Sequence, residues 1–192
     1  MALPVENFSL EFVFLCWGVW LLFWIVSAFF VKRTVERRFG SWRTLIVLGG
    51  IGLVLVLRRT TGSPSPAPPS SRTPAVEILA DVITFAGLGV ALWSRAALGT
   101  NWSGSVAFKE NHELIERGPY RYVRHPIYSG MLLMVLGTSL IRGSVFGFAV
   151  FLLCCLGLWL KARREEALLE GHFPTAYASY KASVKAFIPF LL

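Results

Sequence analysis

The densest group of chemically active side chains lies in one short string, Gly118-Pro119-Tyr120-Arg121-Tyr122-Val123-Arg124-His125-Pro126-Ile127-Tyr128-Ser129-Gly130. Gly-Pro predicts a turn, and the residue before a proline is held out of the helical region, so a helix is expected to begin at Pro126. His125 would then stand at the mouth of a helical bundle, with Tyr128 on the first turn. Anchoring at a membrane surface explains any one of these side chains, but it explains the whole string poorly.

A second group of charged residues follows the last apolar run and comprises Arg163, Arg164, Glu165 and Glu166. Acidic side chains are unfavourable at the C-terminal end of a helix, so either the helix continues past them or they bind a ligand. Arg163 and Glu166 also have the i, i+3 spacing of an ordinary surface pair, worth roughly a few tenths of a kcal/mol. Two carboxylates and two guanidinium groups beside an apolar bundle make a site able to hold a zwitterion.

Composition indicates which elements position these side chains. The chain has 192 residues, of which 55% are hydrophobic and 16% charged, with 7 Trp and 15 Phe. The apolar residues form runs too long for the strands or short helices of a soluble core, so the bilayer is the expected solvent. The same hydrophobic composition excludes intrinsic disorder and a coiled coil. The three cysteines lie inside apolar runs, which argues against a disulfide scaffold and predicts buried thiols.

The predicted fold class is an all-α integral membrane protein forming a single membrane domain, 1–192. About five transmembrane helices are expected, at 8–31, 44–57, 75–98, 126–141 and 143–159. Three N-terminal spans and a Pro/Ser-rich loop at 58–74 make up 1–98. The remaining half, 99–192, contains a helical hairpin of the fourth and fifth spans and a cytoplasmic C-terminal segment. An amphipathic pattern from Lys161 onward predicts a further, interfacial helix, and no strand is readable.

The positions of the basic residues predict the orientation in the membrane. The net charge is +8, and the five-span arrangement puts most of the 19 Lys and Arg on one side. Only Arg58, Arg59, Arg72 and Arg142 fall on the other side. The positive-inside rule therefore places the N-terminus outside and the segment 99–125 and the tail in the cytoplasm, next to anionic lipid head groups. No basic face interleaved with aromatic residues is available for a nucleic acid.

Further strings run through the last half of the chain: Leu98-Gly99-Thr100-Asn101-Trp102-Ser103, His112-Glu113-Leu114-Ile115, Arg124-His125-Pro126-Ile127-Tyr128, Arg164-Glu165-Glu166 and a tail with Phe173, Tyr177 and Tyr180. In this order they resemble the isoprenylcysteine carboxyl methyltransferase family and its phospholipid methyltransferase relatives. The RHP-x-Y string followed about forty residues later by two glutamates is a specific signal. The first half of the chain matches only in being hydrophobic.

The resemblance implies an integral membrane enzyme that transfers a methyl group from S-adenosylmethionine to a lipidic acceptor, in the first place the carboxylate of a prenylcysteine-like substrate. It also implies that 99–192 is the catalytic half, with a cytoplasmic C-terminal cofactor-binding segment. The absence of a G-x-G-x-x-G string agrees with a cofactor site of non-Rossmann type. The implied cofactor-binding residues are His112, Leu114, Ile115, Gly118, Tyr120, His125, Tyr128 and Glu166. The implied catalytic residues beside the acceptor are Arg163, Glu165 and Glu166. Lys161 stands where some relatives have the arginine, so that role belongs to either Arg163 or Lys161.

Simple chemistry is compatible with this interpretation. Methyl transfer from a sulfonium is an in-line displacement, and a carboxylate acceptor is already ionised at pH 7, whereas an amine must first lose a proton. The faces of Tyr120, Tyr128 and Trp102 are suited to a sulfonium through a cation–π contact. A lipidic substrate would enter sideways from the bilayer, and the cofactor would enter from the cytoplasm.

Several alternatives stay open at this stage. The acceptor could be a phospholipid amine or a small thiol. An NADPH-dependent sterol-type double-bond reductase has a similar-looking C-terminal region, although such chains are normally longer. A non-catalytic membrane partner protein is a further alternative, with the Gly143-x-x-x-Gly147 string packing helices. Zinc is not expected, because His112, His125 and His172 lack the paired spacing of zinc ligands.

Overall fold

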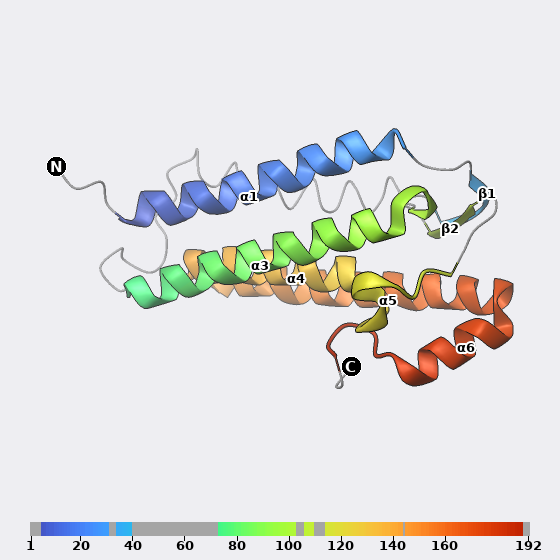
Figure 1. Cartoon of the computed structure of the whole chain (residues 1–192). Helices are drawn as coiled ribbons and strands as arrows, with labels where there is room; N and C mark the ends of the chain where they lie inside the picture. The colour runs from blue at the N-terminus through green and yellow to red at the C-terminus, as the bar shows by residue number, and fades with distance from the viewer. Residues whose placement is uncertain are drawn as a thin grey trace.

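The computed structural model describes residues 5–30, 34–39, 73–102, 106–109, 114–143 and 145–189. Within these ranges the chain is dominated by helices (Figure 1): α1 (Val5–Ala28), α3 (Pro74–Leu98), α4 (Pro126–Arg142), α5 (Val145–His172) and α6 (Pro174–Ser183), with short 3-10 turns at η2 (Gly99–Asn101) and η3 (Gly118–Arg121). The predicted all-α class is confirmed. The predicted span at 44–57 and most of the loop at 58–74 lie outside the described residues, so the number of spans stays a prediction.

Three of the described helices have the length and composition of membrane spans, at Phe8–Ala28, Pro74–Asn101 and Val145–His172, and Pro126–Ile141 is a shorter apolar helix. Large apolar side chains on the outer faces of these helices are exposed, as expected where the surrounding solvent is lipid. Leu152 and Leu153 of α5, for example, are each 65% exposed. The arrangement is that of an integral, all-α membrane protein.

Among the described helices, α3 and α4 pack most closely, because small residues let the two backbones approach each other. A Cβ atom placed on Gly87 would lie 2.6 Å from the carbonyl oxygen of Gly130, and one on Gly137 would lie 2.6 Å from the carbonyl oxygen of Ala80. Ala80 and Ala91 are fully buried in the same interface. Packing through small residues is the usual way for helices to associate in lipid, and here it fixes the start of α4 relative to α3.

The boundaries of α4 and α5 follow local signals. Pro126 occupies the first turn of α4, and Gly143 ends that helix in the left-handed conformation, with φ 55°. The helices α4 and α5 follow one another in the chain and pack against each other. The fifth helix does not end at Trp159, however, because α5 continues to His172 and carries Glu165 and Glu166 in its interior. At 1.5 Å per residue α5 is about 42 Å long.

Two short strands add an element that the sequence did not reveal. β1 (Thr34–Phe39) pairs antiparallel with β2 (Val106–Lys109) beyond the ends of α1 and α3 (Figure 1). The expectation of no strand is wrong at this place. Four to six residues within polar connections are too few to show a period-2 pattern, and the pairing joins segments far apart in the chain.

The end of the bundle beside the strands is tied together by Arg95, which is buried near the end of α3. Its guanidinium group donates hydrogen bonds to the carbonyl oxygens of Ser27, at 2.7 Å, and Gly99, at 2.8 Å. The same group lies 4.4 Å from the ring centroid of Trp102, a cation–π contact. Arg95 therefore holds the end of α1 against the end of α3, next to the segment that leads into the predicted site.

Candidate active site

The string at 118–130 folds largely as its prolines and glycines predict. Gly118 has φ 62°, a left-handed conformation that favours glycine, and it opens the turn η3. His125 has a φ of −123°, which is not helical, and directly precedes Pro126 at the start of α4. Both His125 and Tyr128 are buried. The string thus places the imidazole ring at the N-terminal mouth of α4, facing α5.

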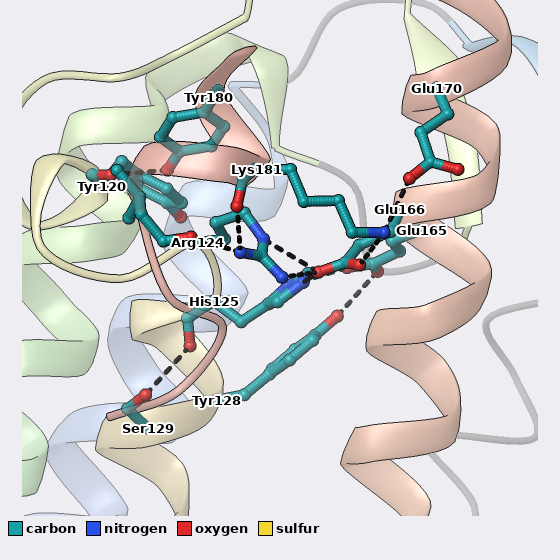
Figure 2. Close-up of polar contacts among 11 residues, drawn as sticks. Tyr120, Arg124, His125, Tyr128, Ser129, Glu165, Glu166, Glu170, Tyr180 and Lys181 are labelled. Atoms are coloured by element: carbon teal, nitrogen blue, oxygen red, sulfur yellow. Dashed lines mark hydrogen bonds and ion pairs between the residues drawn. The ribbon is translucent and has the colours of Figure 1, made fainter. Parts of the chain in front are cut away.

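Glu166 is the centre of the site. Its Oε1 atom accepts hydrogen bonds from Nε and Nη2 of Arg124, at 3.0 and 2.9 Å, and lies 3.1 Å from Nε2 of His125. Its Oε2 atom lies 3.1 Å from Nζ of Lys181 on α6. Figure 2 shows these side chains converging on α5 from the loop and from the tail. The carboxylate is only 5% exposed, so several charged partners are needed to offset its loss of hydration.

Glu165 anchors a second, adjoining network. Tyr128 donates a hydrogen bond of 2.6 Å from its hydroxyl group to Oε1 of Glu165 (Figure 2), and Lys161 Nζ donates one of 2.7 Å to that same hydroxyl oxygen. Lys161 Nζ also lies 3.3 Å from Glu165 Oε1, one helical turn away. Nδ1 of His125 is 3.9 Å from Glu165 Oε2, so the imidazole ring lies between the two glutamates. We call His125, Tyr128, Lys161, Glu165, Glu166, Arg124 and Lys181 the polar cluster.

The backbone of the string is held by the last part of the chain, residues 184–189, here named the tail strap. The amide of Arg124 donates to the carbonyl oxygen of Lys185, at 2.8 Å, and the amide of His125 to that of Ala186, at 2.9 Å. The guanidinium group of Arg124 also donates to the carbonyl oxygens of Lys181 and Val184. One arginine therefore joins the loop, the end of α6 and Glu166, which fixes the polar cluster in place.

Buried tyrosines surround the cluster on the side of α6. Tyr120, Tyr177 and Tyr180 are at most 7% exposed, and Tyr180 donates a hydrogen bond to the carbonyl oxygen of Tyr120. Burial raises the pKa of Tyr120 well above its usual value, and burial likewise raises the pKa of Tyr177 and Tyr180. The phenol oxygen of Tyr177 is buried without a hydrogen-bond partner in the described part of the chain. These phenols are neutral donors that line the inner side of the tail.

An apolar groove adjoins the polar cluster. It has a volume of about 950 Å³ and lies between α3, α4, α5, the segment around η3 and the tail strap. Its lining is almost wholly apolar and includes Trp93, Leu133, Phe151, Trp159 and Phe187. Phe187 also stacks on His125, with ring centroids 5.6 Å apart, so one side chain contacts both the groove and the polar cluster.

The structure brings several of the predicted site residues together and leaves others apart. His125, Tyr128, Glu165 and Glu166 meet in the polar cluster, and Tyr120 and Gly118 lie in the adjoining turn η3. Leu114 and Ile115 are half-buried in the segment before η3, and His112 lies outside the described residues. Arg163 is exposed, and its guanidinium carbon lies 5.7 Å from the ring centroid of Trp159. Lys161, the alternative to Arg163, does belong to the cluster.

Sequence reasoning missed two partners of Glu166. Arg124 directly precedes His125 in the string and carried a usable signal, because a basic side chain beside the predicted site is the simplest counter-ion for a buried carboxylate. Lys181 carried no such signal, since its contact with Glu166 depends on how α6 folds back against α5. The surface pair of Arg163 with Glu166 that the spacing allows is not formed, and Arg124 and Lys181 occupy the carboxylate.

Comparison with known proteins matches the chain to one protein family and to several curated proteins. Residues 76–176, just over half of the chain, match the family described as phospholipid methyltransferase. Protein-S-isoprenylcysteine O-methyltransferase of Schizosaccharomyces pombe is 37% identical over 115 residues, which are 56% of this chain and 48% of that protein. The probable enzyme of the same name from Oryza sativa subsp. indica is 31% identical over 87 residues, 45% of this chain and 46% of its own length.

A third relative carries a different name. The cobalt-zinc-cadmium resistance protein of Cupriavidus metallidurans is 32% identical over 110 residues, 56% of this chain and 49% of that protein. The chain thus spans about half the length of the curated relatives it matches. The matched range 76–176 contains α3 from its third residue onward, all of α4 and α5, and every member of the polar cluster except Lys181. By the extent of this match, the chain belongs to the phospholipid methyltransferase family.

Proposed function

We propose that this protein transfers a methyl group from S-adenosylmethionine to the carboxylate of a prenylcysteine-like lipid at the cytoplasmic side of the membrane. The observation that carries the proposal is the contact of an apolar groove with a buried polar cluster through the stacked rings of Phe187 and His125. The groove suits the chain of a lipid, and the cluster suits charged head groups. The names of the isoprenylcysteine methyltransferase relatives support this pairing of lipid and methyl acceptor.

The residues of the cluster fit S-adenosylmethionine, which supplies the activated methyl group when bound. Its amino acid portion is a zwitterion, and the cluster offers carboxylates and cations side by side at Glu166 and Arg124. The buried and unpartnered phenol group of Tyr177 is a further donor on the side of the tail. We propose that the cofactor is held by the residues that the family resemblance implied: His112, Leu114, Ile115, Gly118, Tyr120, His125, Tyr128 and Glu166.

The cluster offers cations that can meet an anionic acceptor. Arg124, Lys161 and Lys181 lie against Glu165 and Glu166, and Lys181 is also paired with Glu170, 2.7 Å away. A carboxylate is already ionised at pH 7 and needs no general base. The work of the protein is then to position the acceptor and to exclude water, which together can lower a barrier by about 7 to 11 kcal/mol.

Arg163 and Lys161 have different places in this proposal. Trp159 lines the groove, and the guanidinium group of Arg163 lies over its ring, so Arg163 is placed to meet an acceptor head group at the edge of the groove. Lys161 bonds the hydroxyl group of Tyr128 inside the cluster and positions that ring. We propose that Arg163, Glu165 and Glu166 lie beside the acceptor, and that Lys161 supports Glu165.

A second candidate function is methyl transfer to a phospholipid amine. It is favoured by Glu165, whose side chain is 22% exposed and could accept the proton that an ammonium acceptor must lose. The distinction between the two functions is the protonation of the acceptor. Carboxylate methylation should show little loss of rate between pH 8 and pH 6, whereas amine methylation should fall as the amine becomes protonated.

The test uses the purified full chain in mild detergent. We expect S-adenosylmethionine to bind by calorimetry and its labelled methyl group to pass to N-acetyl-S-farnesylcysteine. Transfer to phosphatidylethanolamine vesicles instead would support the second function, and transfer to a small thiol would point to a water-soluble acceptor. Binding of NADPH in place of S-adenosylmethionine would overturn the proposal in favour of a reductase. Binding of neither cofactor would overturn it in favour of a non-catalytic membrane protein.

A further inference from the structure

Phe187 occupies the boundary between the apolar groove and the polar cluster. Its ring lines the groove and stacks on His125, which in turn stacks on Tyr128 with ring centroids 5.5 Å apart and an interplanar angle of 4°. His125 contacts Glu166 directly, at 3.1 Å. An acceptor whose chain lies in the groove must therefore present its head group past the ring of Phe187 to reach the glutamates.

The position of this ring is fixed by the backbone of the tail strap. Ser129 on α4 donates a hydrogen bond of 2.7 Å to the carbonyl oxygen of Phe187, and the preceding residue, Ala186, accepts one from the amide of His125. The side chain also packs against the buried cluster formed by Ile127, Tyr128, Met131, Leu158 and Ala162. Three independent contacts thus hold Phe187 where it meets the imidazole ring, and a side chain held in this way presents a defined opening.

The tail strap lies beyond the range 76–176 that matches the family. Residues that select among acceptors are expected to differ between relatives more than those that bind a common cofactor. The strap lines the groove through Phe187, Ile188 and Pro189, whereas Glu166 and His125 lie within the matched range. A residue of the strap is therefore a suitable candidate for selecting the acceptor.

We infer that Phe187 is a specificity-determining residue that limits the size of the acceptor head group able to pass from the groove to the polar cluster. The inference rests on the proposed function. The selection among head groups is then steric. A well-packed ring clashes with a larger head group and leaves the binding of a smaller one unaffected. Removing the ring should relax the selection, which lowers the ratio of the affinities for a small and a large head group; a change at the cofactor site would alter both affinities alike and leave their ratio unchanged.

The test compares two ligands with the same farnesyl chain and the same carboxylate, N-acetyl-S-farnesylcysteine and N-dansyl-S-farnesylcysteine. Their dissociation constants are measured calorimetrically in the presence of S-adenosylhomocysteine, so no turnover is needed. The wild-type protein should prefer the acetyl compound by about tenfold or more, and Phe187→Ala should reduce that preference to within about threefold. Phe187→Leu should be intermediate, which provides a milder variant should the alanine variant fail to fold.

Ile188→Ala is the matched control, because Ile188 lines the same groove but the ring contact with His125 belongs to Phe187. It should weaken both ligands alike and leave their ratio unchanged. The inference would be overturned if the ratio of the two dissociation constants were unchanged in Phe187→Ala and Phe187→Leu, or if Ile188→Ala lowered that ratio as much as Phe187→Ala does. It would also be overturned if the wild-type protein bound both ligands equally or bound neither. A shifted ratio without any methyl transfer would instead overturn the proposed function alone.

Discussion

Arg124 was given no role from the sequence, yet it joins Glu166 to the tail. It bonds Glu166 through two nitrogen atoms and also bonds the tail through its guanidinium group and its amide. Removing one partner of a buried ion pair leaves the other charge without compensation, so Arg124→Ala should lower stability by about 3 kcal/mol. Thermal unfolding in detergent measures this. Arg121→Ala, at an exposed position of η3, is the control, and an equal melting temperature for the two variants would contradict the central role of Arg124.

Substitutions of Arg163 and of Glu166 should impair different properties of the protein, turnover in the first case and cofactor affinity, activity or both in the second. Arg163→Ala should leave the affinity for S-adenosylmethionine nearly intact and lower the turnover number about tenfold or more, because a contact made mainly in the transition state affects rate rather than ground-state binding. Arg163→Lys should rescue poorly, since an ammonium group lacks the bidentate fork that matches a carboxylate. Glu166→Ala should lower cofactor affinity, activity or both. Calorimetry and single-turnover rates separate these effects.

The outcome for Arg163 also decides between two assignments. Full activity of Arg163→Ala would transfer the proposed acceptor contact to Lys161, which already bonds the hydroxyl group of Tyr128. Lys161→Met would then be the informative variant. If the alanine variants of Arg163 and Glu166 are both fully active, the catalytic assignment at the end of α5 is wrong.

At the scale of elements, the close approach of α3 and α4 predicts a large effect from a single methyl group. A Cβ atom on Gly130 would lie 2.6 Å from the carbonyl oxygen of Gly87 and 2.7 Å from the amide nitrogen of Ala91. Gly130→Ala should therefore force the helices apart and destabilise the protein by about 1 to 3 kcal/mol. Gly89→Ala is the matched control, since nothing lies within 4 Å of its added Cβ atom. Thermal unfolding should separate the two variants, and equal midpoints would contradict the packing described for α3 and α4.

The contact of α6 with η3 predicts a loss of stability at high pH. Burial raises the pKa of Tyr120 and of Tyr180 above the ordinary value of 10. A raised pKa in the folded state means that the folded protein holds its protons more tightly, so this stability is complete below pH 10 and is lost as the pH rises above it. Phenolate absorbance and unfolding midpoints, followed from pH 8 to pH 12, should show ionisation coupled to unfolding. Ionisation of these phenols in a fully folded protein would refute the assignment.

The elements show which features a sequence can predict. The starts of α3 and α4 lie within one residue of the prediction, because Pro74, Pro126 and Gly143 are local signals that act on their own backbone. The continuation of α5 past Trp159 was not predicted, because the run of charged residues there resembles the end of a span. In the structure these charged side chains contact residues of the loop and of α6. Such contacts depend on tertiary packing, which a local sequence pattern does not predict.

The site shows the same division between local and long-range information. The sequence analysis proposed His125, Tyr128, Glu165 and Glu166 from specific strings, and the structure brings these side chains together. The i, i+3 spacing would allow Arg163 to pair with Glu166, whereas the carboxylate of Glu166 is directed to Arg124, His125 and Lys181. Spacing gives the angular position of a side chain on its helix, but the partner that occupies the facing position comes from another element.

At the scale of the whole molecule, the orientation in the membrane is still a prediction from the distribution of Lys and Arg. The start of α3 and the segment before η3 lie at opposite ends of α3, so they should face opposite sides of the bilayer. In intact cells a membrane-impermeant thiol reagent should label Thr73→Cys and should not label Glu116→Cys, both of which are exposed positions. The parent protein, with its native cysteines, is the control. The reverse labelling pattern would contradict the proposed cytoplasmic location of the site.

The length of α5 has a consequence for how the membrane itself acts on the protein. One continuous helix of about 42 Å carries the groove-lining Phe151 and Trp159 and, farther along, Glu165 and Glu166. A hydrocarbon layer of about 30 Å cannot cover all of it, so bilayer thickness and helix tilt set how far the glutamates stand above the acyl chains. Reconstitution in lipids of increasing acyl-chain length should therefore pass through an optimum of methyl transfer, because a thicker bilayer submerges the charged cluster and a thinner one exposes the groove to water.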